Sequence, residues 1–214
     1  SFLPRSGDQF LSLSPSTESL SPEEFENIEV GAKWDIQTGL SFTAAVFRLE
    51  RDSGTTVDPN NPENTILIGS VTEGLELQLQ GQLTSNWQIN AGYSYLDAEE
   101  DGRVVNNVSA NRMLNLVPEH LFSIWNRYDF NEKFGAGLGI VHQDSQFASI
   151  SNAVELPSFT RVDVALYYSF NERIQAQVNI ENLLDEDYFP AAHNDNNIST
   201  GEPLNARFSL SYAF

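Results

Sequence analysis

Apolar and polar residues alternate one by one along much of this chain, and this alternation limits what it can fold into. In residues 28–36 every even position is apolar, while the odd positions carry polar residues or glycine. A period of two is typical of a β-strand with one apolar face. Strands of this kind are predicted at 28–36, 40–47, 75–80, 87–95, 162–170, 174–180 and 206–214. Two more are expected at 121–130 and at the glycine-rich stretch 134–141, which makes the chain all-β with about nine full strands.

The connections between these strands alternate in length. Short turns are expected near residues 38, 84, 132 and 171, and long polar segments at 4–24, 51–65, 97–117, 142–156 and 185–204. Bacterial outer-membrane barrels have short periplasmic turns and long external loops, whereas a soluble sandwich has no reason to place every long connection at one end. The alternation therefore predicts an antiparallel transmembrane β-barrel.

The distribution of charged and aromatic residues favours the same fold. A Lys or Arg that faces lipid at the midplane costs about 2–4 kcal/mol, and the apolar faces carry no charge in their central span. Aromatic residues near strand ends are typical of interfacial girdles; here they are Trp34, Trp87, Tyr95, Tyr168 and Phe170. No run approaches the roughly 18 apolar residues of a membrane helix, so a helical membrane protein is excluded.

The composition excludes several other classes. Lys and Arg number 11 against 30 Asp and Glu, and a net charge of −19 is unsuited to a surface that neutralises nucleic-acid phosphates. The absence of Cys removes disulfides and thiolate zinc sites. The cluster Asp97, Glu99, Glu100 and Asp101 offers oxygen ligands for a divalent cation near lipopolysaccharide, but it lacks the EF-hand pattern, and a solvated loop is the preferred interpretation.

An odd number of strands, with a tenth beginning before Pro4, does not complete the even-stranded barrel of a bacterial single-chain protein. The sequence also starts at Ser1, without an initiator Met. We therefore expect residues 1–214 to be the C-terminal portion of a larger barrel. Unpaired edge strands would make this portion unstable alone in lipid.

The C-terminal region carries a spaced set of residues that points to a family. The set consists of Asn182, Leu183, Leu184, Asp185, Tyr188, Gly201 and Pro203, followed by a final strand ending in Tyr212 and Phe214. It resembles the C-terminal box of TonB-dependent receptors. Residues 22–33, 74–76 and 156–163 are similar to this family too, and residues 2–10 and 192–198 most resemble its catecholate-siderophore branch.

The resemblance implies a barrel of roughly 22 strands, closed by an N-terminal plug, in the outer membrane of a Gram-negative bacterium. The implied function is uptake of ferric siderophores, energised by the TonB complex through the absent N-terminal part. The terminal strand would close the barrel and be read by the assembly machinery, which assigns that role to Phe208, Tyr212 and Phe214; the alternative is ordinary lipid-facing aromatics. The other expected partners are outer-membrane lipid and lipopolysaccharide, with no nucleic acid and a monomeric state.

An anionic, aromatic ferric complex calls for cationic and aromatic side chains in the loops. The candidates are Arg5, Arg103, Arg112, Phe147 and Tyr188, and the alternative for each is an ordinary loop-bracing or solvated role. Arg161 and Asp163 share a polar strand face, where we expect a lumenal ion pair that braces barrel and plug.

Neither direct metal binding nor catalysis is expected. His120, His142 and His193 lie far apart in the sequence, without a second ligand at a recognised spacing. The siderophore itself holds the iron, so iron is expected only as cargo and no cofactor is needed. The sequence has no Gly-x-Ser-x-Gly elbow, paired catalytic carboxylates or phosphate-binding glycine loop, so an enzyme is not expected.

Other functions stay open at this point. A TonB-dependent receptor could take haem, cobalamin or an oligosaccharide, and the external loops and the absent plug would decide the cargo. A passive outer-membrane porin and a soluble lectin-like sandwich are the alternatives from other classes.

Overall fold

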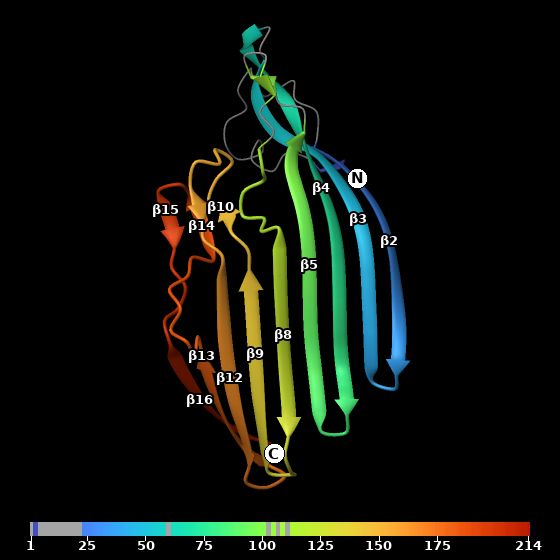
Figure 1. Ribbon diagram of the computed structural model, residues 1–214, viewed down its shortest axis with the longest axis vertical. Helices are drawn as coiled ribbons and strands as arrows, with labels where there is room; N and C mark the ends of the chain where they lie inside the picture. Colours follow the sequence, from blue (N-terminus) through green and yellow to red (C-terminus); the bar gives the residue numbers. More distant parts are fainter. Residues whose placement is uncertain (1, 4–22, 59–60, 102–103, 106–107, 110–111) are drawn as a thin grey trace.

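One curved antiparallel sheet makes up most of the chain (Figure 1). The computed structural model describes the backbone of residues 2–3, 23–58, 61–101, 104–105, 108–109 and 112–214, and the side chains of 24–51, 69–100 and 112–214. Across these ranges, no helix is long and apolar enough to cross a membrane. The sheet has ten strands in the order β1-β2-β3-β4-β5-β8-β9-β12-β13-β16. Its strands are therefore neighbours in the same order in which they occur along the chain.

The strands of the sheet are β1 (Phe2–Leu3), β2 (Glu23–Gln37), β3 (Leu40–Asp58), β4 (Asn61–Thr84), β5 (Trp87–Asp101), β8 (His120–Asp129), β9 (Phe134–Gln143), β12 (Phe159–Ser169), β13 (Ile174–Glu181) and β16 (Asn205–Tyr212). Short two-stranded ladders lie in the connections: β6 (Val104–Val105) with β7 (Val108–Ser109), β10 (Gln146–Phe147) with β11 (Glu155–Leu156), and β14 (Ala191–Asn194) with β15 (Asn197–Ser199). The nine predicted strands are confirmed, and β1 is a short tenth.

Successive connections lie at opposite ends of the sheet, as predicted. The four tight turns lie at one end of the sheet, and the described parts of the long connections lie at the other (Figure 1). The predicted long connection at 51–65 is wrong, because β3 runs on to Asp58 and β4 begins at Asn61. Backbone pairing continues there beyond the apolar layer, since ladder hydrogen bonds do not require an apolar side chain. For the same reason β5 extends to Asp101, while the last strand ends at Tyr212, before Phe214.

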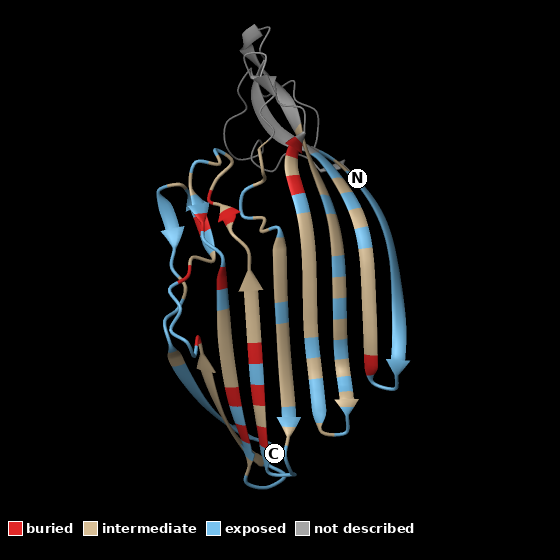
Figure 2. Cartoon of the chain, viewed as in Figure 1, coloured by how far each residue is buried: buried red, intermediate tan, exposed pale blue. Residues whose placement is uncertain are grey.

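One face of the sheet is apolar and exposed. The register places Trp34 opposite Phe42, and Phe42 opposite Leu79, so the even-numbered apolar residues of β2 and β3 share a face with the odd-numbered ones of β4. Nearly all described residues of β2 and β16 are exposed (Figure 2). Val30 is 70% exposed and Phe208 is 68% exposed. An apolar surface of this extent requires an apolar environment.

Aromatic rings gather on this face near the tight turns. Trp87 lies opposite Tyr128, and Phe134 lies opposite Tyr168. The rings of Tyr168 and Phe170 meet edge to face at 4.9 Å. Further pairs are Tyr128 with Phe130, Phe130 with Phe134, and Tyr212 with Phe214. The arrangement is that of an interfacial girdle.

The apolar face ends on the side of the long connections. On β8 the stretch from Tyr128 to His120 spans roughly 26 Å at about 3.3 Å per residue, which fits an apolar band about 25 Å tall. Arg48 lies at the corresponding edge on β3 and is paired with Glu50 at 2.9 Å and with Glu73. The first charges of this face therefore lie beyond its centre.

The opposite face packs closely around the glycines of β9. The ring of Trp125 lies against the backbone of Gly137 and Gly139, where an added Cβ at either glycine would approach ring atoms to 2.6 Å. At Gly135 an added Cβ would come within 2.3 Å of the Asp129 carboxylate. The close packing predicted for this glycine-rich strand is confirmed.

Candidate functional site: the C-terminal clamp and the outer connections

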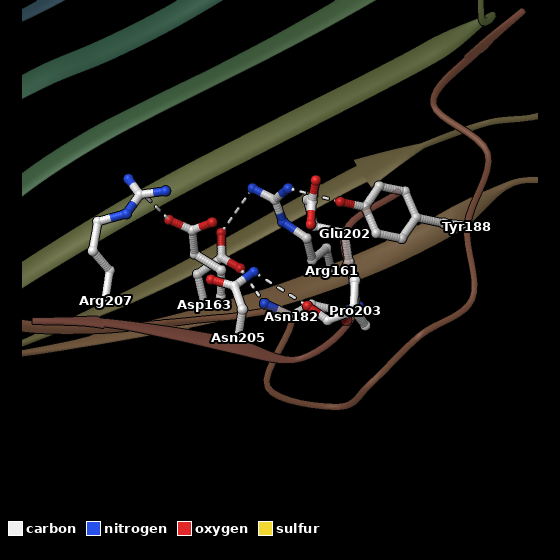
Figure 3. A network of polar contacts seen from close by, with 9 residues as sticks. Arg161, Asp163, Asn182, Tyr188, Glu202, Pro203, Asn205 and Arg207 are labelled. Carbon is white, nitrogen blue, oxygen red and sulfur yellow. Dashed lines mark hydrogen bonds and ion pairs between the residues drawn. The ribbon is translucent and has the colours of Figure 1, made fainter. Parts of the chain in front are cut away.

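Arg161 and Asp163 form the expected ion pair on the polar face of β12. Arg161 donates a hydrogen bond from Nη2 to Oδ2 of Asp163 at 2.9 Å, and another from Nη1 to the hydroxyl of Tyr188 at 3.1 Å (Figure 3). Both side chains are largely shielded from solvent, with 29% and 15% of their surfaces exposed. The Arg161 guanidinium thus joins Asp163 on β12 to Tyr188 in the last long connection, 25 positions further along the chain.

Asn182 connects this ion pair to both arms of the last connection. Its backbone N–H donates to Oδ1 of Asp163 at 2.9 Å. Its side-chain Nδ2 donates to the carbonyls of Glu186 and Glu202, and its Oδ1 accepts the N–H of Glu186. Only 1% of Asn182 is exposed, and its φ of 53° is a left-handed conformation that Asn tolerates better than most residues. The residue therefore holds the ascending and the descending arm at the same point.

Asp185 and Tyr188 complete the base of this connection. Asp185 also has a left-handed φ, of 52°, and its Oδ1 accepts the N–H of Leu204, just before β16 begins. The ring of Tyr188 is buried against Phe159, with 4.6 Å between ring centroids. Gly201 donates its N–H to the Tyr188 carbonyl, and a Cβ at Gly201 would lie 2.2 Å from the Tyr188 ring. Only glycine leaves room for this ring.

We call this set the C-terminal clamp; it consists of Arg161, Asp163, Asn182, Asp185, Tyr188 and Gly201. Four of its members belong to the C-terminal box of the sequence, so the box residues that lie far apart in the chain meet in one network. Leu183, Leu184 and Pro203 lie in the same two arms, and Leu184 is 66% exposed. The contacts of the clamp go mainly to backbone groups, which it thereby positions. Within the part of the chain that is described, no group of three metal-ligating side chains occurs.

The loop candidates fall into three situations. Arg5 and Arg103 lie outside the described residues. Arg112 is half-buried and donates from Nη1 to the carbonyl of Ile150 at 3.2 Å, and Phe147 in β10 accepts the N–H of Leu116 through its carbonyl. Tyr188 is buried in the clamp. Arg112 and Phe147 are therefore brought near the same connection, while a ligand role for any of these residues stays a prediction.

Asn152 is a residue that sequence reasoning missed. Its side-chain amide forms a pair of hydrogen bonds with the backbone of Met113, with Oδ1 accepting the Met113 N–H and Nδ2 donating to the Met113 carbonyl, both at 2.9 Å. The contact joins the predicted 97–117 and 142–156 connections. A single Asn among small polar residues gives no sequence signal for such a long-range contact.

The polar face also contains a large open hollow near the tight turns. Its volume is about 1100 Å³. Its lining is rich in side-chain amides and includes Gln37, Gln80, Gln82, Gln88, Asn90 and the ring of Trp125. The polar lining is what an interior facing water or another protein segment requires.

Comparisons with known proteins agree with this geometry. A family model described as "TonB dependent receptor-like, beta-barrel" matches residues 1–183. The probable TonB-dependent siderophore receptor PiuA of Acinetobacter baumannii is 30% identical over 221 aligned residues, which cover 97% of this chain and 29% of that protein. The metal-pseudopaline receptor CntO of Pseudomonas aeruginosa is 33% identical over 201 residues, covering 90% of the chain and 28% of that protein. The catecholate siderophore receptor Fiu of Escherichia coli K12 is 30% identical over 174 residues, covering 78% and 22%.

Solved structures have the same fold. The crystal structure of PiuA from Acinetobacter baumannii superposes with a TM-score of 0.83 at 28% identity, covering 94% of this chain and 30% of that one. The closed form of the ferric-catecholate import receptor Fiu from E. coli K12 gives a TM-score of 0.85 at 24% identity, covering 100% and 32%. The chain thus spans less than a third of the length of each of these relatives.

Proposed function

The chain belongs to the TonB-dependent receptor family and forms part of its β-barrel, and from this premise we propose that the complete protein imports ferric siderophores across the outer membrane of a Gram-negative bacterium. Its relatives are transport receptors. The proposal extends their activity to this protein, with no catalytic step and no resident cofactor, since iron would arrive within the cargo. Coupling to TonB would be made by parts of the receptor outside residues 1–214.

The two-faced sheet is the observation that carries the proposal. One face exposes apolar side chains from β2 to β16 and ends in an aromatic girdle. The other face holds Arg161, Asp163, the amides around the hollow and the packed ring of Trp125. A soluble sandwich would bury the apolar face, whereas a barrel wall exposes it to lipid and turns the polar face to the lumen. The contrast supports an outer-membrane location, with lipid and lipopolysaccharide as neighbours.

The relatives and the outer connections support one class of cargo. The names of PiuA and Fiu refer to siderophores, and that of Fiu to catecholates. A ferric catecholate is anionic and aromatic. Arg112 and Phe147 lie at the outer end of the sheet, in two connections that are joined by hydrogen bonds from Arg112 to the Ile150 carbonyl and from Leu116 to the Phe147 carbonyl. Cationic and aromatic groups are suited to such a complex. A ferric catecholate is therefore the cargo that we favour.

A second candidate cargo comes from CntO, whose name refers to a complex of metal and pseudopaline. Its identity to this chain, 33%, is slightly above that of PiuA and Fiu. A metal–pseudopaline complex is the alternative cargo that this relative supports. Haem, cobalamin and oligosaccharides have no comparable support, and family membership sets aside the passive porin and the soluble sandwich.

The experiment is a binding and uptake comparison with the full-length receptor. The purified receptor in detergent would be titrated with a ferric catecholate, a ferric hydroxamate, metal–pseudopaline and haem, using intrinsic fluorescence. Cells with and without TonB would then be tested for uptake of radioactive iron supplied as the tightest ligand. We expect tightest binding of the ferric catecholate and uptake only with TonB. Selective binding of metal–pseudopaline would replace the cargo, and uptake that does not depend on TonB would refute the proposed mechanism.

A further inference from the structure

The outer end of β5 continues into the next connection by backbone pairing. Glu99 and Met113 form an isolated antiparallel bridge. Beside it, Glu100 donates its N–H to the Arg112 carbonyl at 2.8 Å, and Leu114 donates its N–H to the Ala98 carbonyl at 2.9 Å. Residues 112–114 therefore act as a further strand segment on β5, although they lie in a connection.

The next connection is attached to this segment from its other side. The amide of Asn152 pairs with the N–H and carbonyl of Met113, as a strand residue would. Leu116 donates its N–H to the Phe147 carbonyl at 2.9 Å, and the Arg112 guanidinium reaches the Ile150 carbonyl. Asn152 has a φ of 54°, a left-handed conformation that Asn tolerates better than most residues.

The last connection is attached in turn. Gln146, which is 5% exposed, donates from Nε2 to the Pro190 carbonyl at 3.0 Å. Ser151 donates its hydroxyl hydrogen to Oδ2 of Asp195 at 2.7 Å. Between the two connections lies a buried apolar cluster of Ala148, Leu156 and Ala192, with Val154 and Phe189 packed against it.

These contacts make one body from three connections. We define the outer block as residues 112–116, 146–156 and 189–195. It is joined to the barrel wall through β5 at one side and through the C-terminal clamp at the other, because the clamp fixes both arms of the connection that carries residues 189–195. Any displacement of one part would break hydrogen bonds to the next and expose the apolar cluster to water.

We propose that the outer block is a fixed wall at the mouth of the receptor, and that capture and release of the cargo proceed without its movement. The inference rests on the proposed import function. Asn152 is the central positioning residue, because it joins two connections through one amide group. The block also holds the guanidinium of Arg112 at a constant place, since one of its N–H groups is bound to the Ile150 carbonyl.

The test is a reversible cross-link between the block and the barrel wall. Glu99→Cys on β5 and Met113→Cys in the block, which face one another in the isolated bridge, are introduced together into the full-length receptor and joined by a reducible disulfide. Residues 1–214 contain no Cys, and any Cys elsewhere in the receptor is first replaced by Ser. We expect the cross-linked receptor to bind and import the ferric siderophore within about twofold of its reduced form, because a fixed wall has no conformational equilibrium for the link to shift. The matched controls are the two single Cys variants oxidised and reduced in the same way.

Loss of import in the cross-linked receptor, with recovery on reduction, would overturn the fixed wall. If neither the reduced variant nor the wild-type receptor imports the complex, the proposed function fails, and the wall is then judged by hydrogen exchange alone. In the cargo-free receptor we expect slow exchange at the amides of Leu114, Leu116 and Ala148, because each donates to a carbonyl within the block or to Ala98. Fast exchange at these amides that slows only on cargo addition would refute the proposal.

Discussion

The backbone N–H of Asn182 donates a hydrogen bond to Oδ1 of Asp163 at 2.9 Å, which ties the end of β13 to the middle of the ion pair on β12. The other carboxylate oxygen of Asp163 is bound to Arg161, and Arg161 is bound to Tyr188. The contact therefore links the barrel wall to the base of the last connection. Because β16 begins directly after this connection, the clamp also sets where the last strand starts.

Replacement of Asn182 is expected to destabilise the folded barrel. Asn182→Gly keeps the left-handed φ but removes three side-chain hydrogen bonds in a buried site, which should cost about 2–4 kcal/mol. Asn182→Ala should cost about 1 kcal/mol more, because a Cβ without a compensating polar group disfavours that φ. Urea unfolding of the full-length protein in detergent measures both. Equal stability of the two variants would contradict the contribution from φ.

Gly201→Ala should be strongly destabilising, because its Cβ would overlap the Tyr188 ring. Overpacking of this kind costs about 1–3 kcal/mol. The double variant Gly201→Ala with Tyr188→Leu should recover part of the loss, and the coupling is obtained from a double-mutant cycle with thermal unfolding followed by gel shift. Tyr188→Phe is the control, since it keeps the ring and removes only the hydroxyl bound by Arg161. Strict additivity of the two changes would show that the clash is relieved elsewhere.

The same substitution at two adjacent residues of β16 should destabilise the receptor to very different extents. Phe208→Arg places a cation on the exposed apolar face and should cost about 2–4 kcal/mol near the midplane. Ser209→Arg places it on the opposite face and should be tolerated much better. The readout is the amount of heat-modifiable receptor in the outer membrane. A similar loss for both variants would argue that β16 has no lipid-facing side.

Asn152→Gly should loosen the outer block without unfolding the barrel. The variant permits the φ of 54° and removes the amide pair to Met113. A lost hydrogen bond of about 1.5 kcal/mol corresponds to roughly tenfold faster exchange at the Met113 amide. Hydrogen exchange with mass spectrometry measures this, and the urea midpoint should change little. Ser149→Ala, which leaves the Asn152–Met113 pair intact, is the control.

Arg112 can be tested as a ligand residue by comparing two substitutions. If its free N–H groups bind the anionic cargo, Arg112→Ala should weaken binding by about 10–100-fold, whereas Arg112→Lys should retain part of the affinity through its charge. The measurement is the Kd of the ferric catecholate with the full-length receptor. Arg127→Lys, placed on β8 over the ring of Tyr167, is a control for a cation on the polar face away from the outer block. Unchanged Kd in Arg112→Ala would leave this residue a bracing role only.

The sheet could be predicted because its information is local. Each apolar face corresponds to a period of two in the sequence. The side of the strand on which Val30 or Phe208 lies can therefore be predicted without knowing the partner strand. The extent of β3 and β4 could not be predicted from the same signal. Beyond Arg48 the pairing depends on backbone hydrogen bonds, which continue whether or not the side chains alternate.

The clamp was only partly accessible from the sequence. The spacing of Asn182, Asp185 and Tyr188 marked a region, and the ion pair of Arg161 with Asp163 followed from their shared strand face. The enclosure of Tyr188 by Gly201 and the bond from Asn152 to Met113 could not be predicted, because they depend on how separate connections fold back on one another. A ligand role for Arg5 and Arg103 stays a prediction, since both lie outside the described residues.

Trp125, Gly137 and Gly139 constrain one another's substitution in evolution. Alanine at Gly137 or Gly139 collides with the indole while the indole is present, and a smaller residue at 125 leaves a void beside two bare backbones. A substitution at Trp125 alone, or at either glycine alone, therefore gives a poorly packed protein. In a lineage of such proteins the three positions should be inherited as one character, kept together or exchanged together.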